Sequence, residues 1–200
     1  MSAIKSLRAM LSGGDRRSIG RANEVAALVL TLPERVDELL ELLWDAAALV
    51  RMRSADALEK LSRERIDLLQ AYKNELLGLM AETAQQELCW HLAAIVPRLE
   101  LTLAERRRAA EVLETYLTDR SSIVKTCAMQ GLWELARHDA GMRPRVVELV
   151  RELTRTGTAA MRARGRKLLL EIDQDEDPRK TKKSSIFTKY HCTKLNRLVQ

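Results

Sequence analysis

A pattern that recurs every 36–38 residues constrains this chain more than any other feature of its sequence. Its copies begin at Asp45, Thr83, Asp119 and Thr156, which lie 38, 36 and 37 residues apart. A large apolar residue follows five positions after each start, at Val50, Leu88, Val124 and Met161. A fixed period of this length is typical of chains in which similar units stack side by side.

Each copy is preceded by a second apolar segment with helical spacing. Val36, Leu39, Leu40 and Leu43 share one helical face before the first copy, and Val146, Val147, Val150 and Leu153 do so before the last. Apolar residues make up 46% of the chain and charged residues 31%, with only 8 Gly and 4 Pro, which favours helices over a β-sandwich. Each unit is therefore predicted to be a helical hairpin, opened by a proline at Pro33 and at Pro144.

Three positions of the repeat have predicted roles. We expect the four start residues to cap the second helix of each hairpin. The apolar residue five positions later should face the first helix. The basic residue that comes next (Arg51, Lys125 and Arg162) should reach a carboxylate or carbonyl of a neighbouring hairpin, with an interruption at Cys89 in the second copy.

The chain at this point resembles the HEAT-repeat family, in particular small bacterial HEAT-repeat proteins. The resemblance is carried by Asp45, Val50, Arg51 and Leu58 and by Asp119, Val124, Lys125 and Leu132. It implies an all-α, right-handed superhelical solenoid of about four hairpins over residues 33–172. It further implies that the second helices line a concave face, and that the chain is a binding scaffold for a protein partner rather than an enzyme.

The two ends of the chain differ from the repeats. Residues 2–12 and 18–31 are predicted to be helices that cap the first hairpin, so residues 1–32 form an N-terminal segment. Residues 173–200 are acidic and then basic, and we expect them to be disordered. Residues 178–200 hold seven bases and no acid, so the net charge of +6 leaves residues 1–177 at −1.

No arrangement of residues predicts catalysis, a metal ion or a small-molecule cofactor. The chain lacks a glycine-rich phosphate loop and a nucleophile motif, and its three cysteines lack metal-ligand spacing. We interpret His91 and Cys127 as packing residues, and also the three tryptophans, Trp44, Trp90 and Trp133. Uncharged apolar stretches reach only about 10 residues, too few to cross a bilayer, so we expect a cytoplasmic protein with no membrane partner.

The candidate binding residues are basic. Arg51, Lys125 and Arg162 form either a structural ladder between repeats or a row that binds a ligand. A second group of bases is either a solvated end of the stack or a contact site for an acidic partner or a nucleic-acid backbone. Its members are Arg155, Arg162 and Arg166, with Lys180, Lys182 and Lys183 of the tail.

Two further functions stay open beside the protein-binding scaffold. The first is nucleic-acid binding through the basic last repeat and the tail, as in the HEAT-like alkylpurine DNA glycosylases that the chain is similar to in its repeats. None of their active-site residues can be placed here, because no Trp–Asp pairing matches. The second is pigment handling, as in HEAT-like phycobilin lyases, for which the sequence offers no specific feature.

Overall fold

Every regular element in residues 5–15 and 18–176, the part of the chain that this computed structural model describes, is helical. The prediction of an all-α protein is thereby confirmed. The chain divides into two units, Met1–Arg143 and Pro144–Gln200. Among the described residues, no helix combines the length and the apolar character needed to cross a membrane.

The first unit holds two N-terminal helices and three hairpins. The N-terminal helices are α1 (Leu7–Leu11) and α2 (Ala22–Thr31). The hairpins, written with their short 3-10 segments (η), are η1 (Pro33–Arg35), α3 (Val36–Glu41), η2 (Leu42–Trp44) and α4 (Ala48–Glu64); η3 (Ile66–Tyr72), α5 (Lys73–Glu82), α6 (Gln86–Ile95) and η4 (Val96–Arg98); and α7 (Leu103–Tyr116) and α8 (Ser122–Arg137). The second unit is built from α9 (Arg143–Thr156) and α10 (Ala159–Glu176).

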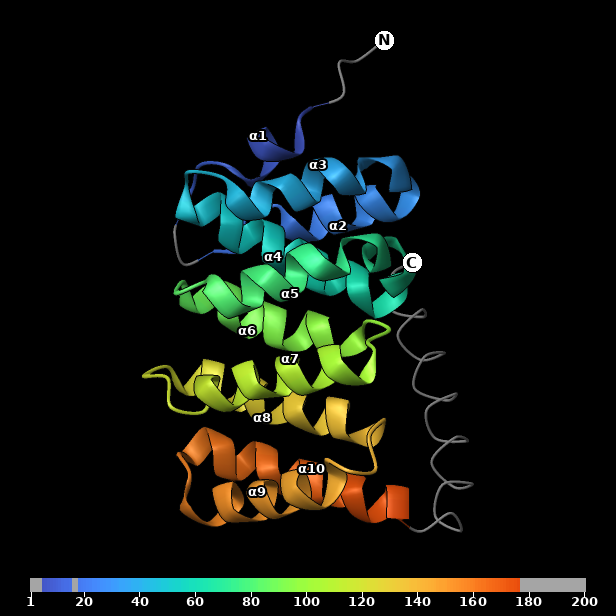
Figure 1. The fold of residues 1–200 in the computed structure, drawn as a ribbon. Helices are drawn as coiled ribbons and strands as arrows, with labels where there is room; N and C mark the ends of the chain where they lie inside the picture. Colours follow the sequence, from blue (N-terminus) through green and yellow to red (C-terminus); the bar gives the residue numbers. More distant parts are fainter. Residues whose placement is uncertain (1–4, 16–17, 177–200) are drawn as a thin grey trace, which may run out of the picture. The chain divides into compact units, whose positions relative to one another are not determined.

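The helices of the first unit lie in two layers (Figure 1). In one layer α2, α4, α6 and α8 pack against each other in that order, and we call it the second-helix layer. The other holds α3, α5 and α7, which we call the first-helix layer, and there α5 packs against α7. The short helix α1 packs against α2, α3 and α4.

The phase of the repeat is confirmed. All four second helices begin three residues after the predicted start, and the residue at the fifth position is buried in each copy: Val50, Leu88, Val124 and Met161 are at most 3% exposed. Burial of such a side chain contributes about 1.5–3 kcal/mol, so these positions anchor each hairpin.

The predicted helix caps are wrong in detail. Asp45, Thr83 and Asp119 each accept a hydrogen bond from the backbone amide two residues ahead, before the helix begins. They therefore form Asx- and ST-type turns that lead into the helix. The N-cap of α8 is Ser121, whose hydroxyl accepts from the amide of Val124. Thr156 instead ends α9 and donates to the carbonyl of Glu152.

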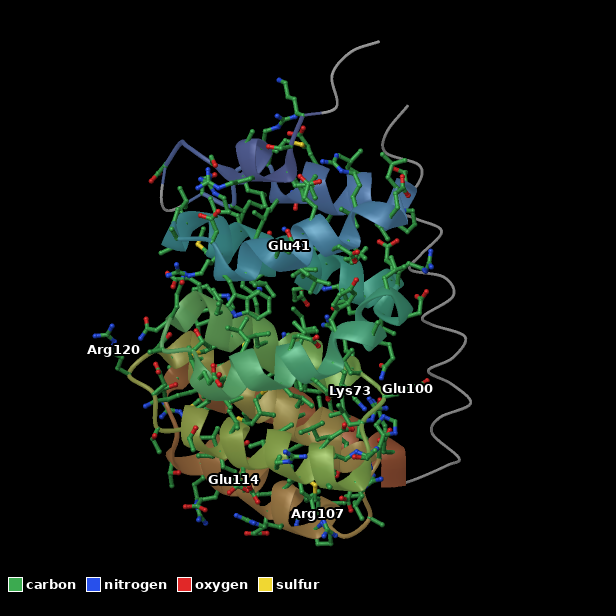
Figure 2. All side chains as sticks on the ribbon, turned by 45° about the horizontal axis from the view of Figure 1, so that its top comes forward. Glu41, Lys73, Glu100, Arg107, Glu114 and Arg120 are labelled. Atoms are coloured by element: carbon green, nitrogen blue, oxygen red, sulfur yellow. The ribbon has the colours of Figure 1, made fainter. Side chains whose placement is uncertain are left out.

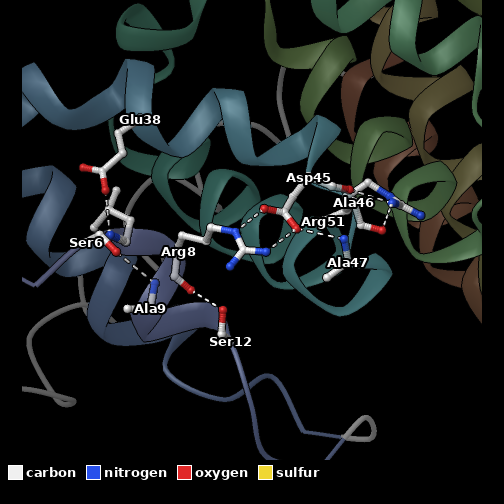
Figure 3. Close-up of polar contacts among 10 residues, drawn as sticks. Ser6, Arg8, Ala9, Ser12, Glu38, Asp45, Ala46, Ala47 and Arg51 are labelled. Atoms are coloured by element: carbon white, nitrogen blue, oxygen red, sulfur yellow. Dashed lines mark hydrogen bonds and ion pairs between the residues drawn. The ribbon is translucent and has the colours of Figure 1, made fainter.

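The N-terminal segment is fastened to the first hairpin by two arginines. Arg8 on α1 donates to both carboxylate oxygens of Asp45, over 2.5 and 3.1 Å (Figure 3). Arg53 on α4 is 1% exposed, and its guanidinium donates to four backbone carbonyls at the end of α1 and in the connection to α2, those of Leu11, Gly13, Asp15 and Ser18. The carbonyls replace the water that a buried cation loses.

Candidate functional site

Arg51 is engaged within the fold. Its Nη1 donates to the carbonyl of Asp45 at 2.7 Å, and its Nε donates to Oε1 of Gln85 in the next hairpin at 2.8 Å. Arg51 therefore reaches the next hairpin, but its acceptor there is the side-chain amide of Gln85 rather than the predicted carboxylate or carbonyl, and the carbonyls that it binds belong to its own hairpin.

The ladder does not continue along the repeats. Lys125 on α8 is half-buried, and its ammonium group makes no hydrogen bond or ion pair within the described part of the chain. In the second copy, Sγ of Cys89 lies 3.5 Å from the carbonyl of Thr83, in the place where Arg51 meets Asp45. In the second unit, the guanidinium of Arg162 donates to the carbonyl of Gly157 in its own hairpin, at 2.8 Å.

The other predicted binding residues within the repeats are exposed. Arg155 on α9 and Arg166 on α10 belong to the second unit and have no ion-pair partner among residues 5–15 and 18–176. Lys180, Lys182 and Lys183 lie outside the described residues. The predicted site residues thus include one bonded arginine in the first unit and a group of exposed bases in the second.

The packing expected for the tryptophans holds for two of the three. Trp133 is fully buried, and half-buried Trp90 meets His91 in an edge-on contact with 5.7 Å between ring centres. Burial lowers the pKa of His91, while nearby Asp56 and Glu59 act in the opposite direction. Trp44, in contrast, is 53% exposed, so its predicted packing role is wrong.

On α4, within the second-helix layer, one cluster of charged side chains is paired internally. Lys60 binds Asp56, and Glu59 accepts from Arg63 on its own helix and from Arg98 of η4 at 2.8 Å. Burial acts to raise the pKa of Glu59, but the hydrogen bonds from Arg63 and Arg98 outweigh it and hold this pKa below its ordinary value. Because these charges satisfy one another, this cluster leaves few groups to recognise a ligand.

The first-helix layer is hollowed on both sides of α5. Between α5 and α7 lies a cavity of about 470 Å³ with a largely apolar wall. Between α3 and α5 lies a smaller one of about 300 Å³, which we call the α3–α5 groove. Figure 2 labels Glu41 on α3 and Lys73 at the start of α5. The residues that line the α3–α5 groove are Asp37, Leu40, Glu41, Trp44, Tyr72 and Glu75.

Sequence reasoning missed both cavities. The spacing of apolar residues predicts which side of each helix is buried, but not how far apart two neighbouring first helices stand. The sequence signal nearest to the α3–α5 groove is Trp44, which directly precedes the repeat start Asp45, but its exposure is visible only in the structure. No group of three or more His, Cys, Asp or Glu side chains in the described residues is arranged to hold a metal ion.

Comparison with family models, with curated proteins and with solved structures finds no match to this chain.

Proposed function

We propose that this chain is a non-enzymatic helical-repeat scaffold of the HEAT type, a right-handed superhelix in its repeats, that binds another protein on its first-helix layer. The observation that supports this most directly is the pair of cavities on either side of α5. Concave, partly apolar hollows with a few polar groups at their rims are the surfaces to which proteins attach ligands and peptide segments.

We favour the first-helix layer over the second-helix layer because its larger cavity exposes apolar side chains beside polar ones. The larger cavity has Leu77, Met80 and Val112 in its wall, and its rim includes the exposed side chains of Asn74 and Glu111. An apolar wall with a polar rim is the arrangement found in protein interfaces.

A photoreactive amino acid placed at Asn74 tests the proposal in the cells that make the protein. Asn74 lines the cavity between α5 and α7, and the matched control is Ile123, which is 55% exposed on α8. The proposal expects an adduct of discrete mass from position 74 that is absent from position 123. An adduct from position 123 alone, or none from position 74, would overturn it.

The exposed bases support a second candidate function, binding of a nucleic-acid backbone. Arg155, Arg166 and Lys167 are exposed without a described ion-pair partner, and residues 178–200 add seven positive charges. If all seven bases of the tail met phosphates of a single strand, the logarithm of affinity against that of salt concentration would slope by roughly −5. A slope near zero for a labelled single strand, or unchanged binding after those seven bases become glutamine, would exclude this function.

A further inference from the structure

The α3–α5 groove is lined by apolar side chains and by negatively charged ones. Its apolar lining residues are Leu40, which is 3% exposed, and Trp44, which is 53% exposed. Its charged lining residues are Asp37, Glu41 and Glu75, and no base lines it. A volume of about 300 Å³ is at the lower end of ligand pockets, so it suits one or two side chains of a partner rather than a folded element.

The bases of the same two segments are occupied elsewhere. Residues 33–44 and 66–82 contain seven acids and only two bases, Arg35 and Lys73. Arg35 pairs with Glu38 at 2.6 Å, and Lys73 pairs with Glu105 of α7 at 2.8 Å. Neither the carboxylate of Glu41 nor that of Glu75 makes a hydrogen bond or ion pair within the described residues. The carboxylates of the groove are therefore left without a counter-charge from these segments.

The tyrosine in the wall responds to this negative charge. Tyr72 donates its hydroxyl to Asp37, and that hydrogen bond is the main reason why the pKa of Tyr72 lies above its ordinary value. Burial, the charge of Asp37 and the charge of Glu75 act in the same direction. Acids from both α3 and α5 thus act at one point of the groove.

We propose that the α3–α5 groove binds a basic peptide segment of a partner protein, with an arginine or lysine side chain laid against Trp44 and its charge between Glu41 and Glu75. A long basic side chain fits because its stem is apolar and its head is charged, which matches the wall and the rim in turn. A cation over an indole ring gains further attraction from the ring electrons. Phosphate and carboxylate ligands would be repelled here, so this inference, which rests on the proposed function, gives the partner segment a positive charge.

Matched variants of the full chain test the inference. Glu41→Gln with Glu75→Gln removes two carboxylates from the groove. The control pair, Glu34→Gln with Glu82→Gln, removes two exposed carboxylates from the same two segments, seven residues from each target and outside the groove. Both pairs change the net charge equally, and both should leave thermal unfolding unchanged because all four side chains are exposed.

The probe is a short synthetic peptide in which two arginines flank a leucine, and its counterpart carries uncharged citrulline in place of arginine. In an NMR titration at low salt, the indole N–H resonance of Trp44, assigned with Trp44→Ala, should shift while that of Trp90 stays in place. The double variant Glu41→Gln with Glu75→Gln should bind the arginine peptide about fivefold more weakly, because two exposed ion pairs are lost. The natural chain should bind the citrulline peptide about fivefold more weakly for the same reason. The control pair should stay within about twofold of the natural chain.

Three results would overturn the inference. They are equal weakening by both pairs of variants, a shift of Trp90 instead of Trp44, and no binding of the arginine peptide. A discrete adduct from position 74 in the cross-linking experiment, together with any of these three results, would leave the protein-binding function supported and this groove assignment refuted.

Discussion

Arg51 and Gln85 hold each other across two consecutive hairpins. Nε of Arg51 donates to Oε1 of Gln85 at 2.8 Å, and Nε2 of Gln85 donates to the carbonyl of Ala48 at 2.9 Å. The guanidinium of Arg51 in the first hairpin thus binds the side-chain amide of Gln85 in the second. The same amide donates a hydrogen bond back to the first turn of α4. The pair fixes the N-terminal ends of α4 and α6 relative to each other.

Replacing Arg51 with methionine should lower the free energy of unfolding by about 2 kcal/mol. Methionine keeps an apolar stem but leaves the carbonyl of Asp45 and the amide of Gln85 without their charged donor, and hydrogen bonds to charged groups contribute about 1.5–3 kcal/mol. Urea unfolding measures the change. Lys125→Met is the control at the same repeat position and should change stability by no more than about 0.5 kcal/mol. Equal losses in the two variants would contradict the difference between the copies.

The repeat in the sequence predicted the helical hairpins and their buried positions. It did not predict the partners of individual polar side chains. The period predicts the burial of Val50, Leu88, Val124 and Met161 correctly. An apolar residue at a fixed position of the repeat lies on the same face of each second helix, and that face is the one that packs against the neighbouring helices. The basic position that follows is not so constrained. A long arginine finds whichever acceptor lies near, and whether Gln85 lies within reach of Arg51 depends on the packing of two helices.

Arg53 should be the most sensitive polar residue of the first unit. Arg53→Met would remove the charged donor from four backbone carbonyls, so the free energy of unfolding should fall by about 3 kcal/mol or more. Amide hydrogen exchange should accelerate in α1 and α2, which this residue fastens to α4. Arg63→Met on the same helix removes an exposed arginine and should have a small effect. If the exchange of α1 is unchanged in Arg53→Met, the fastening role is wrong.

Substitution of Gly20 tests the position of the Arg53 guanidinium in a second way. Its φ is +56°, and a Cβ placed on it would lie 2.8 Å from Cζ of Arg53. Gly13 has a similar φ of +72°, but nothing lies within 4 Å of a Cβ there. Gly13→Ala should cost only the backbone strain of about 1–2 kcal/mol. Gly20→Ala should cost measurably more in thermal unfolding, because it also displaces the guanidinium.

Glu105 should make stability depend on pH in the acid range. Hydrogen bonds from Lys73, from the backbone of Thr102 and from its side chain lower the pKa of Glu105 from 4.5 to about 2. A lowered pKa in the folded state means that this contribution is complete above pH 4.5 and is lost as the pH falls towards 2. The stability gap between the natural chain and Glu105→Gln should therefore narrow from about pH 6 to about pH 3 in urea unfolding. Glu111→Gln on the same helix, with no described ion pair, should show no such narrowing.

Two glycines within helices should respond in opposite directions to the same added methyl group. A Cβ at Gly131 would lie 2.6 Å from the carbonyl oxygen of Ala93 and 3.0 Å from Cδ1 of Leu113, where α8 approaches α6 and α7. Gly131→Ala should therefore destabilise the protein by about 1–3 kcal/mol, as overpacking of a dense core does. A Cβ at Gly78 on α5 meets nothing within 4 Å, so Gly78→Ala should stabilise it by about 0.5–1 kcal/mol, because alanine loses less backbone freedom on folding. Urea unfolding of both variants measures the signs, and a stabilising Gly131→Ala would contradict the close approach of α6 and α8.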